Sequence, residues 1–328
     1  MAGQTTSEVW DSRWSSTRRT VDSKQIDNVF EAYNALGFHR RRGMQIMDGG
    51  GKEISVIIET GSSTAEAFDG YDPLSKTPAD PFQSAHYNRR YYAVPIVLDD
   101  TTNWQNSGKE QVFDLLKGLG DNAMNSLLKS INEDICGNQS GKSIIGYQDI
   151  MADSANEVLG GIDPADTASW ESQRYTASKT FTTDTVDTIF DGFVAWNAIM
   201  DLCRIQGGKN DAIVTTYSIA SAYRTALAST GYGEVSLSNV EGIKGPEFPR
   251  YMGAEVIADN DIASLHSYHI DTSSVQLRVM KQANFKKTPF VSLQSNGQLA
   301  QLSYLVAGLQ LITNNRRRNG VATAITGV

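Results

Sequence analysis

Cysteine, proline and long hydrophobic runs are all scarce in this chain of 328 residues. The two cysteines, Cys136 and Cys203, lie far apart, so neither a disulfide framework nor a CxxC metal site is available, and a reducing compartment is favoured. Only 8 prolines accompany 40% hydrophobic residues, which excludes a disordered or collagen-like chain. The longest apolar stretch, around residues 304–312, is far shorter than the roughly 20 residues that span a bilayer. We expect a soluble protein without a signal peptide or a membrane partner.

An excess of basic charge is also missing. The chain has 29 Lys and Arg against 37 Asp and Glu, which gives a formal net charge of −8. A negative net charge argues against non-specific binding of nucleic acid by the whole surface. At roughly 150 residues per domain, the length suggests two domains, or one large domain with an insertion.

Familiar catalytic and metal-binding patterns are absent from the sequence, which has no GxSxG elbow, no HExxH and no dinucleotide fingerprint. His266 and His269 could share a helix face, but no Cys, Asp or Glu completes a ligand set at a familiar spacing. Cys203 follows an apolar helical pattern, which is more typical of a core residue than of a nucleophile. We therefore expect no enzyme activity, no cofactor and no metal.

The segment Gly137–Ser143, with the sequence GNQSGKS, is similar to a phosphate-binding loop but is one residue short of the Walker A spacing. It also follows a predicted helix and precedes the β-prone Ile144 and Ile145, whereas a phosphate loop needs a strand before it and a helix after it. The sequence therefore predicts a polar connector.

Residues 1–43 form a polar, locally basic arm. Apolar residues at helical spacing predict an amphipathic helix in this arm that ends at Gly37. These residues are Ile26, Val29, Phe30, Tyr33 and Leu36. Because the arm alone cannot bury such a stripe, we expect it to dock on the body or on a neighbouring chain. Arg40, Arg41 and Arg42 follow, and they are either a solvated charge run or a contact for an acidic partner.

Two expected strands, Glu53–Thr60 and Tyr87–Leu98, flank the loop sequence 61–85. Acidic residues outnumber the single Lys76 in this loop, and apolar side chains favour a contact element over a floppy insertion. The acidic residues are Glu66, Asp69, Asp72 and Asp80, and the apolar ones are Phe68, Tyr71, Leu74 and Phe82. The pattern predicts a long, protruding hairpin.

The strongest helix signal covers residues 107–136, with a continuous apolar stripe and Gly137 just past its end. At 1.5 Å per residue, such a helix is about 40 Å long and suits the backbone of an extended domain. The middle third of the sequence predicts mixed α/β structure. Residues 290–312 are strand-like and are followed by the polar turn Asn314–Gly320.

An arm, a long hairpin, a long helix and an α/β lobe without a catalytic pattern indicate a protein built to contact neighbours. The sequence resembles the major capsid proteins of tailed bacteriophages, which share the Hong Kong 97-like fold. The resembling segments occur in the family's order from about residue 25 to 325, nearly the whole chain. They are Gly70–Leu74 with Thr77 and Pro78, Asn106–Gln111, Gly160–Asp163 with Trp170, and Asn315–Arg318 before Gly320.

This resemblance implies an α+β fold in four parts. Residues 1–43 would be the N-terminal arm, and residues 44–100 the extended loop with its flanking strands. Residues 101–145 and 285–328 would form the peripheral domain around the spine helix 107–136. Residues 146–284 would form the axial α/β domain.

The resemblance also implies a function and a set of partners. The chain would form pentamers and hexamers of itself in an icosahedral head that encloses double-stranded DNA, bound without sequence specificity. It would assemble in the bacterial host cytoplasm and reside in the virion. A separate scaffolding protein is expected because only 43 residues precede the hairpin. A portal protein is a further expected partner, and a decoration protein is a candidate.

The residues expected to contact neighbouring subunits belong to the arm, the loop and the C-terminal turn. They are Arg40, Arg41, Arg42, Glu66, Phe68, Asp69, Tyr71, Asp72, Leu74, Lys76, Arg316, Arg317 and Arg318. Some relatives cross-link a loop Lys to a neighbour's Asn, but no motif secures this for Lys76 with Asn314 or Asn315. Two alternatives stay open: an encapsulin-like compartment that encloses cargo enzymes, and an α/β enzyme with an unfamiliar site.

Overall fold

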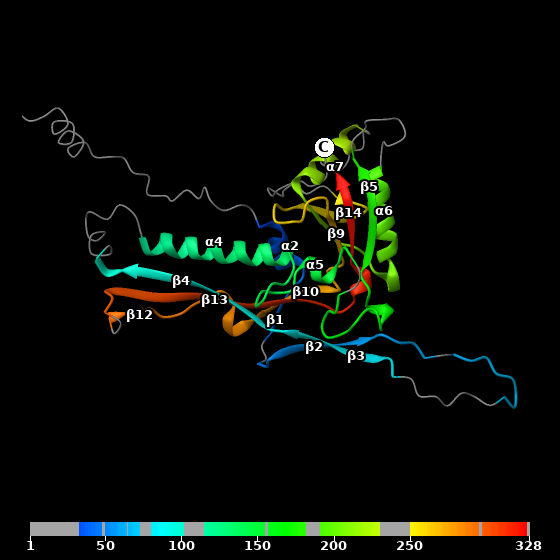
Figure 1. The fold of residues 1–328 in the computed structure, drawn as a ribbon, viewed down its shortest axis with the longest axis horizontal. Coiled ribbons are helices and arrows are strands. Elements are labelled where there is room, and N and C mark those ends of the chain that lie inside the picture. The colour runs from blue at the N-terminus through cyan, green and yellow to red at the C-terminus, as the bar shows by residue number, and fades with distance from the viewer. Residues whose placement is uncertain are drawn as a thin grey trace, which may run out of the picture.

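The computed structural model describes residues 33–47, 50–63, 65–72, 80–101, 115–154, 157–181, 191–229, 250–294 and 297–326. They form two six-stranded sheets and one two-stranded hairpin (Figure 1). Among these residues, no helix combines the length and the apolar character that crossing a membrane requires.

The first sheet is organised around one long strand, β13 (Ala300–Thr313). Four strands pair with β13, and β1 adds to the edge formed by β10. Their bounds are β1 Met44–Met47, β4 Arg90–Asp99, β10 Val275–Met280, β11 Lys286–Lys287 and β12 Val291–Ser292. The helix α4 (Leu115–Cys136) runs along β4 and β13 and covers one face of this sheet (Figure 1).

The apolar stripe of α4 is buried as its spacing predicts. Leu127, Ile131 and Ile135 are almost fully buried, and the helix ends just before Gly137. On the sheet side, the hydroxyl of Tyr92 donates a hydrogen bond of 2.5 Å to Asp134. Of the expected helix 107–136, residues 107–114 lie outside the described part of the chain, and the remainder is confirmed.

The second sheet has the strand order β5-β14-β9-β6-β8-β7. The strands are β5 Gln173–Thr180, β6 Ala212–Thr215, β7 Arg250–Tyr251, β8 Ala254–Ala258, β9 Ser267–Ile270 and β14 Gly320–Thr326. The helices α6 (Asp191–Cys203) and α7 (Tyr217–Ser229) pack on one face around Trp196, which contacts Phe181 and Tyr223 at ring distances of 5.0 Å. The other face belongs to the core shared with the first sheet, so the two lobes have one continuous interior.

The hairpin consists of β2 (Glu53–Glu59) and β3 (Phe82–Asn88), paired antiparallel as expected. Its base is fixed to the body, because the Tyr87 hydroxyl donates to the carbonyl of Thr313 and the His86 N–H donates to that of Gly160, both at 2.8 Å. The prediction of a single strand over Tyr87–Leu98 is wrong. β3 ends at Asn88, and after Arg89 the chain leaves the hairpin and joins the first sheet as β4.

The arm helix also differs from the expectation. The helix α2 covers Asn34–Arg42, so Gly37 lies inside it and Gly43 follows its end. The buried side chains of Leu36, Phe38 and His39 hold the helix against the body on both sides of Gly37. Its last turn carries Arg40 to Arg42, where the negative end of the helix dipole favours cations. The predicted residues Ile26, Val29 and Phe30 lie outside the described residues.

Short helices complete the fold. One α-helical turn, α5, covers Tyr147–Ile150, and the 3-10 helices of the described residues are η2 Ala168–Trp170, η3 Ile205–Gly207, η4 Lys281–Ala283 and η6 Arg316–Arg318.

The expected boundary between lobes at residue 285 needs correction for two strands. β10, expected in the axial domain, pairs with β13 in the first sheet, and β14, expected in the peripheral domain, lies in the second sheet. The reason is that the chain crosses between the sheets three times, between β4 and β5, between β9 and β10, and between β13 and β14.

Candidate functional site

The tip of the hairpin loop is built as a tight turn over Asp69–Asp72. The N–H of Asp72 donates to the Asp69 carbonyl, and the N–H of Asp69 donates to the Asp72 carboxylate, each at 3.0 Å. Gly70 has a φ of 44°, a conformation that suits glycine. The turn leaves Tyr71 fully exposed and Phe68 largely exposed, beside exposed Glu66, Asp69 and Asp72. Leu74 and Lys76, also predicted as contacts, lie outside the described residues.

The three arginines of the α2 end are exposed but hold contacts within the chain. Arg41 and Arg42 lie 3.1 Å and 3.9 Å from the carboxylate of Glu255. Arg40 places its guanidinium over the ring of Phe285, with 5.7 Å from the guanidinium carbon to the ring centroid. These residues are therefore ordered at the surface, where a further partner can reach them.

Arg316 must be removed from the contact candidates, because it is completely buried. Its guanidinium donates to three backbone carbonyls, of Ile150 at 2.6 Å, Asp149 at 2.8 Å and Glu157 at 2.9 Å. Burial lowers the pKa of this guanidinium from its usual value. The residue thus binds the C-terminal turn to α5 and to the segment after it instead of facing a neighbour.

The other two arginines of this turn stay close to the body. Arg318 lies 3.7 Å from the carboxylate of buried Asp271 and is one-quarter exposed, while Arg317 is partly exposed. The basic turn predicted as a surface patch is thus mainly a structural joint.

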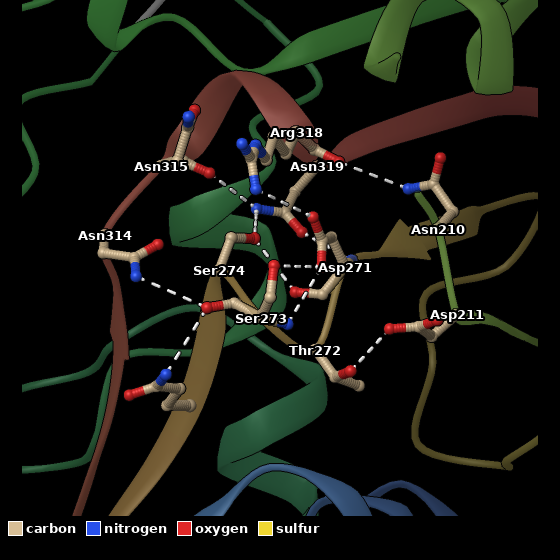
Figure 2. Close-up of polar contacts among 11 residues, drawn as sticks. Asn210, Asp211, Asp271, Thr272, Ser273, Ser274, Asn314, Asn315, Arg318 and Asn319 are labelled. Atoms are coloured by element: carbon tan, nitrogen blue, oxygen red, sulfur yellow. Dashed lines mark hydrogen bonds and ion pairs between the residues drawn. The ribbon is translucent and has the colours of Figure 1, made fainter. Parts of the chain in front are cut away.

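This joint is the place where the last two of the three crossings between the sheets lie side by side (Figure 2). One of these crossings is Asp271–Ser274, and the other is Asn314–Asn319. Antiparallel pairs flank them, Val275 with Thr313 in one sheet and His269 with Gly320 in the other. A two-stranded ribbon therefore passes from one lobe to the other and is interrupted only by this polar segment.

Asn319 is the centre of the joint and is completely buried. Its side-chain oxygen accepts from the N–H of Asp271 at 2.9 Å, and its amide donates to the Ser274 hydroxyl at 2.7 Å and to the Asn315 carbonyl at 2.9 Å (Figure 2). Sequence reasoning treated residues 314–320 as a surface turn. The one signal for a buried role was three asparagines in six residues, since Asn bonds backbone groups at turns.

The histidines and cysteines do not form a chemical site. His39 and His269 are buried, with the His39 ring 2.7 Å from the Tyr147 hydroxyl, and burial lowers their pKa values to about 4 and about 3. Burial likewise raises the pKa of Cys203 to about 12, as a core thiol requires. Within the described ranges, no three His, Cys, Asp or Glu side chains converge in a way that could hold a metal ion.

The segment similar to a phosphate loop is a structural connector, as predicted. The N–H of Gln139 donates to the carboxylate of Asp149 at 2.7 Å, and that of Ser140 to the Ser143 hydroxyl at 2.8 Å. Amides that would hold a phosphate are therefore already bonded within the chain.

Comparison with known proteins separates sequence from fold. No family model and no curated protein matches the sequence. Solved structures match closely in three dimensions at low identity. A chain of the cyanophage A-1(L) capsid asymmetric unit is similar over 94% of this chain and 97% of its own, with a TM-score of 0.69 and 13% identity.

Two further structures agree. A chain from the capsid of a native GTA particle has a TM-score of 0.66 and 10% identity, covering 99% of this chain and 100% of its own. A chain from Mycobacterium phage Bobi has a TM-score of 0.60 and 13% identity, with complete coverage of both. Agreement over nearly the full length of both partners shows that this protein has the mixed α/β fold of the cyanophage and GTA capsid chains.

Proposed function

We propose that this chain is the major shell protein of a bacteriophage-type icosahedral head, assembled from pentamers and hexamers around double-stranded DNA. The observation that carries the proposal is the likeness to capsid chains over nearly the whole length of both partners. The described surface supports it, because the hairpin loop extends from the body and exposes aromatic side chains that need a partner.

The parts of the chain acquire roles in this proposal. The lobe of α4 and the first sheet is the peripheral domain, and the lobe of the second sheet is the axial domain around the symmetry axes. The hairpin and its loop lie across a neighbouring subunit. A scaffolding protein, a portal protein and a decoration protein are partners in the same proposal, and the role is structural rather than enzymatic. The structures named above do not support the encapsulin-like alternative.

The test is assembly of the full chain, expressed alone and with a scaffolding protein from the same genome. Size-exclusion chromatography with light scattering should give megadalton particles, and electron microscopy should show closed shells with five-fold and six-fold capsomers. A monodisperse monomer under both conditions would overturn the proposal.

A further inference from the structure

Basic and acidic residues are unevenly distributed along the chain. Residues 272–328 contain seven Lys and Arg but no Asp or Glu, so all 37 acidic residues precede them. Arg316 is buried and Arg318 pairs with Asp271. In contrast, Lys281 and the β11 residues Lys286 and Lys287 are exposed, so β11 carries exposed positive charge in this region.

These lysines belong to a surface that combines cations with aromatic rings. Lys287 places its ammonium 4.6 Å from the ring centroid of Phe290, and Arg40 lies over Phe285, the residue before Lys286. We call this surface the basic strip: Arg40, Phe285, Lys286, Lys287 and Phe290. Its cations attract carboxylates, and its half-buried rings offer apolar area to a second aromatic group.

The loop tip has the complementary character. Asp69 and Asp72 flank the exposed ring of Tyr71, and Phe68 precedes them. The described loop residues, 60–63, 65–72 and 80–81, include four acidic residues and no basic one. The turn bonds between Asp69 and Asp72 hold this arrangement before any partner binds, which reduces the entropy lost on docking.

The tip cannot reach the basic strip of its own chain. Figure 1 shows the loop at one end of the longest axis and β12, which follows the strip, toward the other end. The tip and the strip are also different surfaces. A contact between them is therefore head to tail, and such contacts generate rings when the rotation closes.

We propose that the acidic tip of one copy docks on the basic strip of the next copy, head to tail, and that this contact closes subunits into rings. The inference rests on the proposed shell function and names the surface that receives the loop. A strip of this charge could also bind the phosphates of DNA. The exposed aromatic rings and the carboxylates of the tip favour a second copy, and the tests below distinguish the two.

The first test is disulfide trapping in a variant that carries Tyr71→Cys and Lys287→Cys. The native thiols, Cys136 and Cys203, are buried. Under mild oxidation, assembled particles should give a ladder of covalent multimers larger than dimers on a non-reducing gel, because each copy joins two different neighbours. A control with Ser130→Cys, on exposed α4 surface, replaces Lys287→Cys and should give no ladder. Particles that yield only dimers, only intramolecular bonds or no bonds overturn the inference and leave the shell function standing.

The second test is charge exchange, which needs no new cysteine. Lys286→Glu with Lys287→Glu should reduce particle yield about tenfold, because like charges then meet across the contact. Asp69→Lys with Asp72→Lys should do the same, and combining all four changes should restore assembly. The control, Lys117→Glu with Lys142→Glu, changes two other exposed lysines by the same charge and should assemble normally.

Each result of the charge-exchange test decides whether the basic strip binds a second copy of the chain or DNA. Strip variants that assemble normally but package less DNA would assign the strip to nucleic acid and overturn the inference. Four changes that fail to restore assembly would overturn it as well. Wild-type chain that forms no shells would overturn the proposed function itself.

Discussion

The side-chain oxygen of Asn319 accepts a hydrogen bond from the backbone N–H of Asp271 at 2.9 Å, and this bond connects the last two crossings between the sheets. The same side chain donates to Ser274, so one buried amide serves both strands of the ribbon. The relative placement of the two lobes therefore depends on a buried polar side chain.

Asn319→Ala should lower the free energy of unfolding by about 2 kcal/mol, because buried polar groups lose their partners. The control is Asn314→Ala, whose side chain donates only an exposed bond of 3.3 Å to Ser273 and should cost less than about 0.5 kcal/mol. Urea unfolding of unassembled subunits measures both. Equal losses in the two variants would contradict the central role of Asn319.

Arg316→Lys should destabilise the subunit by about 3 kcal/mol, since an ammonium group cannot reproduce the forked contacts with the three carbonyls. Arg317→Lys is the matched control in the same turn and should change the stability by less than about 0.5 kcal/mol. Thermal melts of both variants provide the comparison. A stable Arg316→Lys subunit would mean that the buried guanidinium can be replaced by any cation.

Leu127→Ala should cost about 2–5 kcal/mol, as expected for truncation of a buried side chain on the α4 stripe. Leu116 lies on the same helix but is 39% exposed, so Leu116→Ala should cost much less. Chemical denaturation of the two variants tests the difference. If their midpoints coincide, the stripe does not bury Leu127 in solution.

Acid should destabilise the subunit through His39 and His269. Burial lowers their pKa values to about 4 and about 3, below the ordinary value of 6.5, so the folded state keeps both rings neutral. The contribution of the two histidines to the unfolding free energy is complete above pH 6.5, where their rings are neutral in both the folded and the unfolded chain. It is lost as the pH falls from 6.5 toward 4, because the unfolded chain binds protons first.

By pH 4, the loss for a single buried histidine is roughly 3 kcal/mol. The unfolding free energy, followed between pH 7 and pH 4, should decrease less steeply in a His269→Gln variant than in the wild type. The control is His86→Gln, which removes an exposed histidine and should not reproduce the change seen in His269→Gln. An unchanged slope in His269→Gln would contradict the assignment.

Periodicity in the sequence predicted the elements whose contacts are local. The α4 stripe and the β2–β3 hairpin follow from repeating apolar side chains, and the structure confirms both over the described residues. The end of α2 was misplaced because glycine at position 37 suggested a stop, while the burial of Phe38 and His39 outweighs the cost of a helical glycine.

The joint could not be predicted because its determinants are distant in the chain. The guanidinium of Arg316 donates to backbone carbonyls that lie more than 150 positions earlier in the chain. A run of three arginines has no local sequence feature that shows which of them is buried. The basic strip depends in the same way on Arg40 meeting Phe285. In contrast, the lack of acidic residues after Asp271 is visible in the sequence and was the signal that could have indicated it.

The positions of β13 and β14 have a consequence for how the protein is made. Four of the other strands in the first sheet pair with β13, and β14 lies between β5 and β9 in the second sheet. Neither sheet can close until residues 300–326 have left the ribosome, although domains of many chains fold in turn during synthesis. A nascent chain therefore lacks both finished lobes for most of its translation. Polysomes, on which many copies lie close together, therefore carry chains in which neither six-stranded sheet is complete.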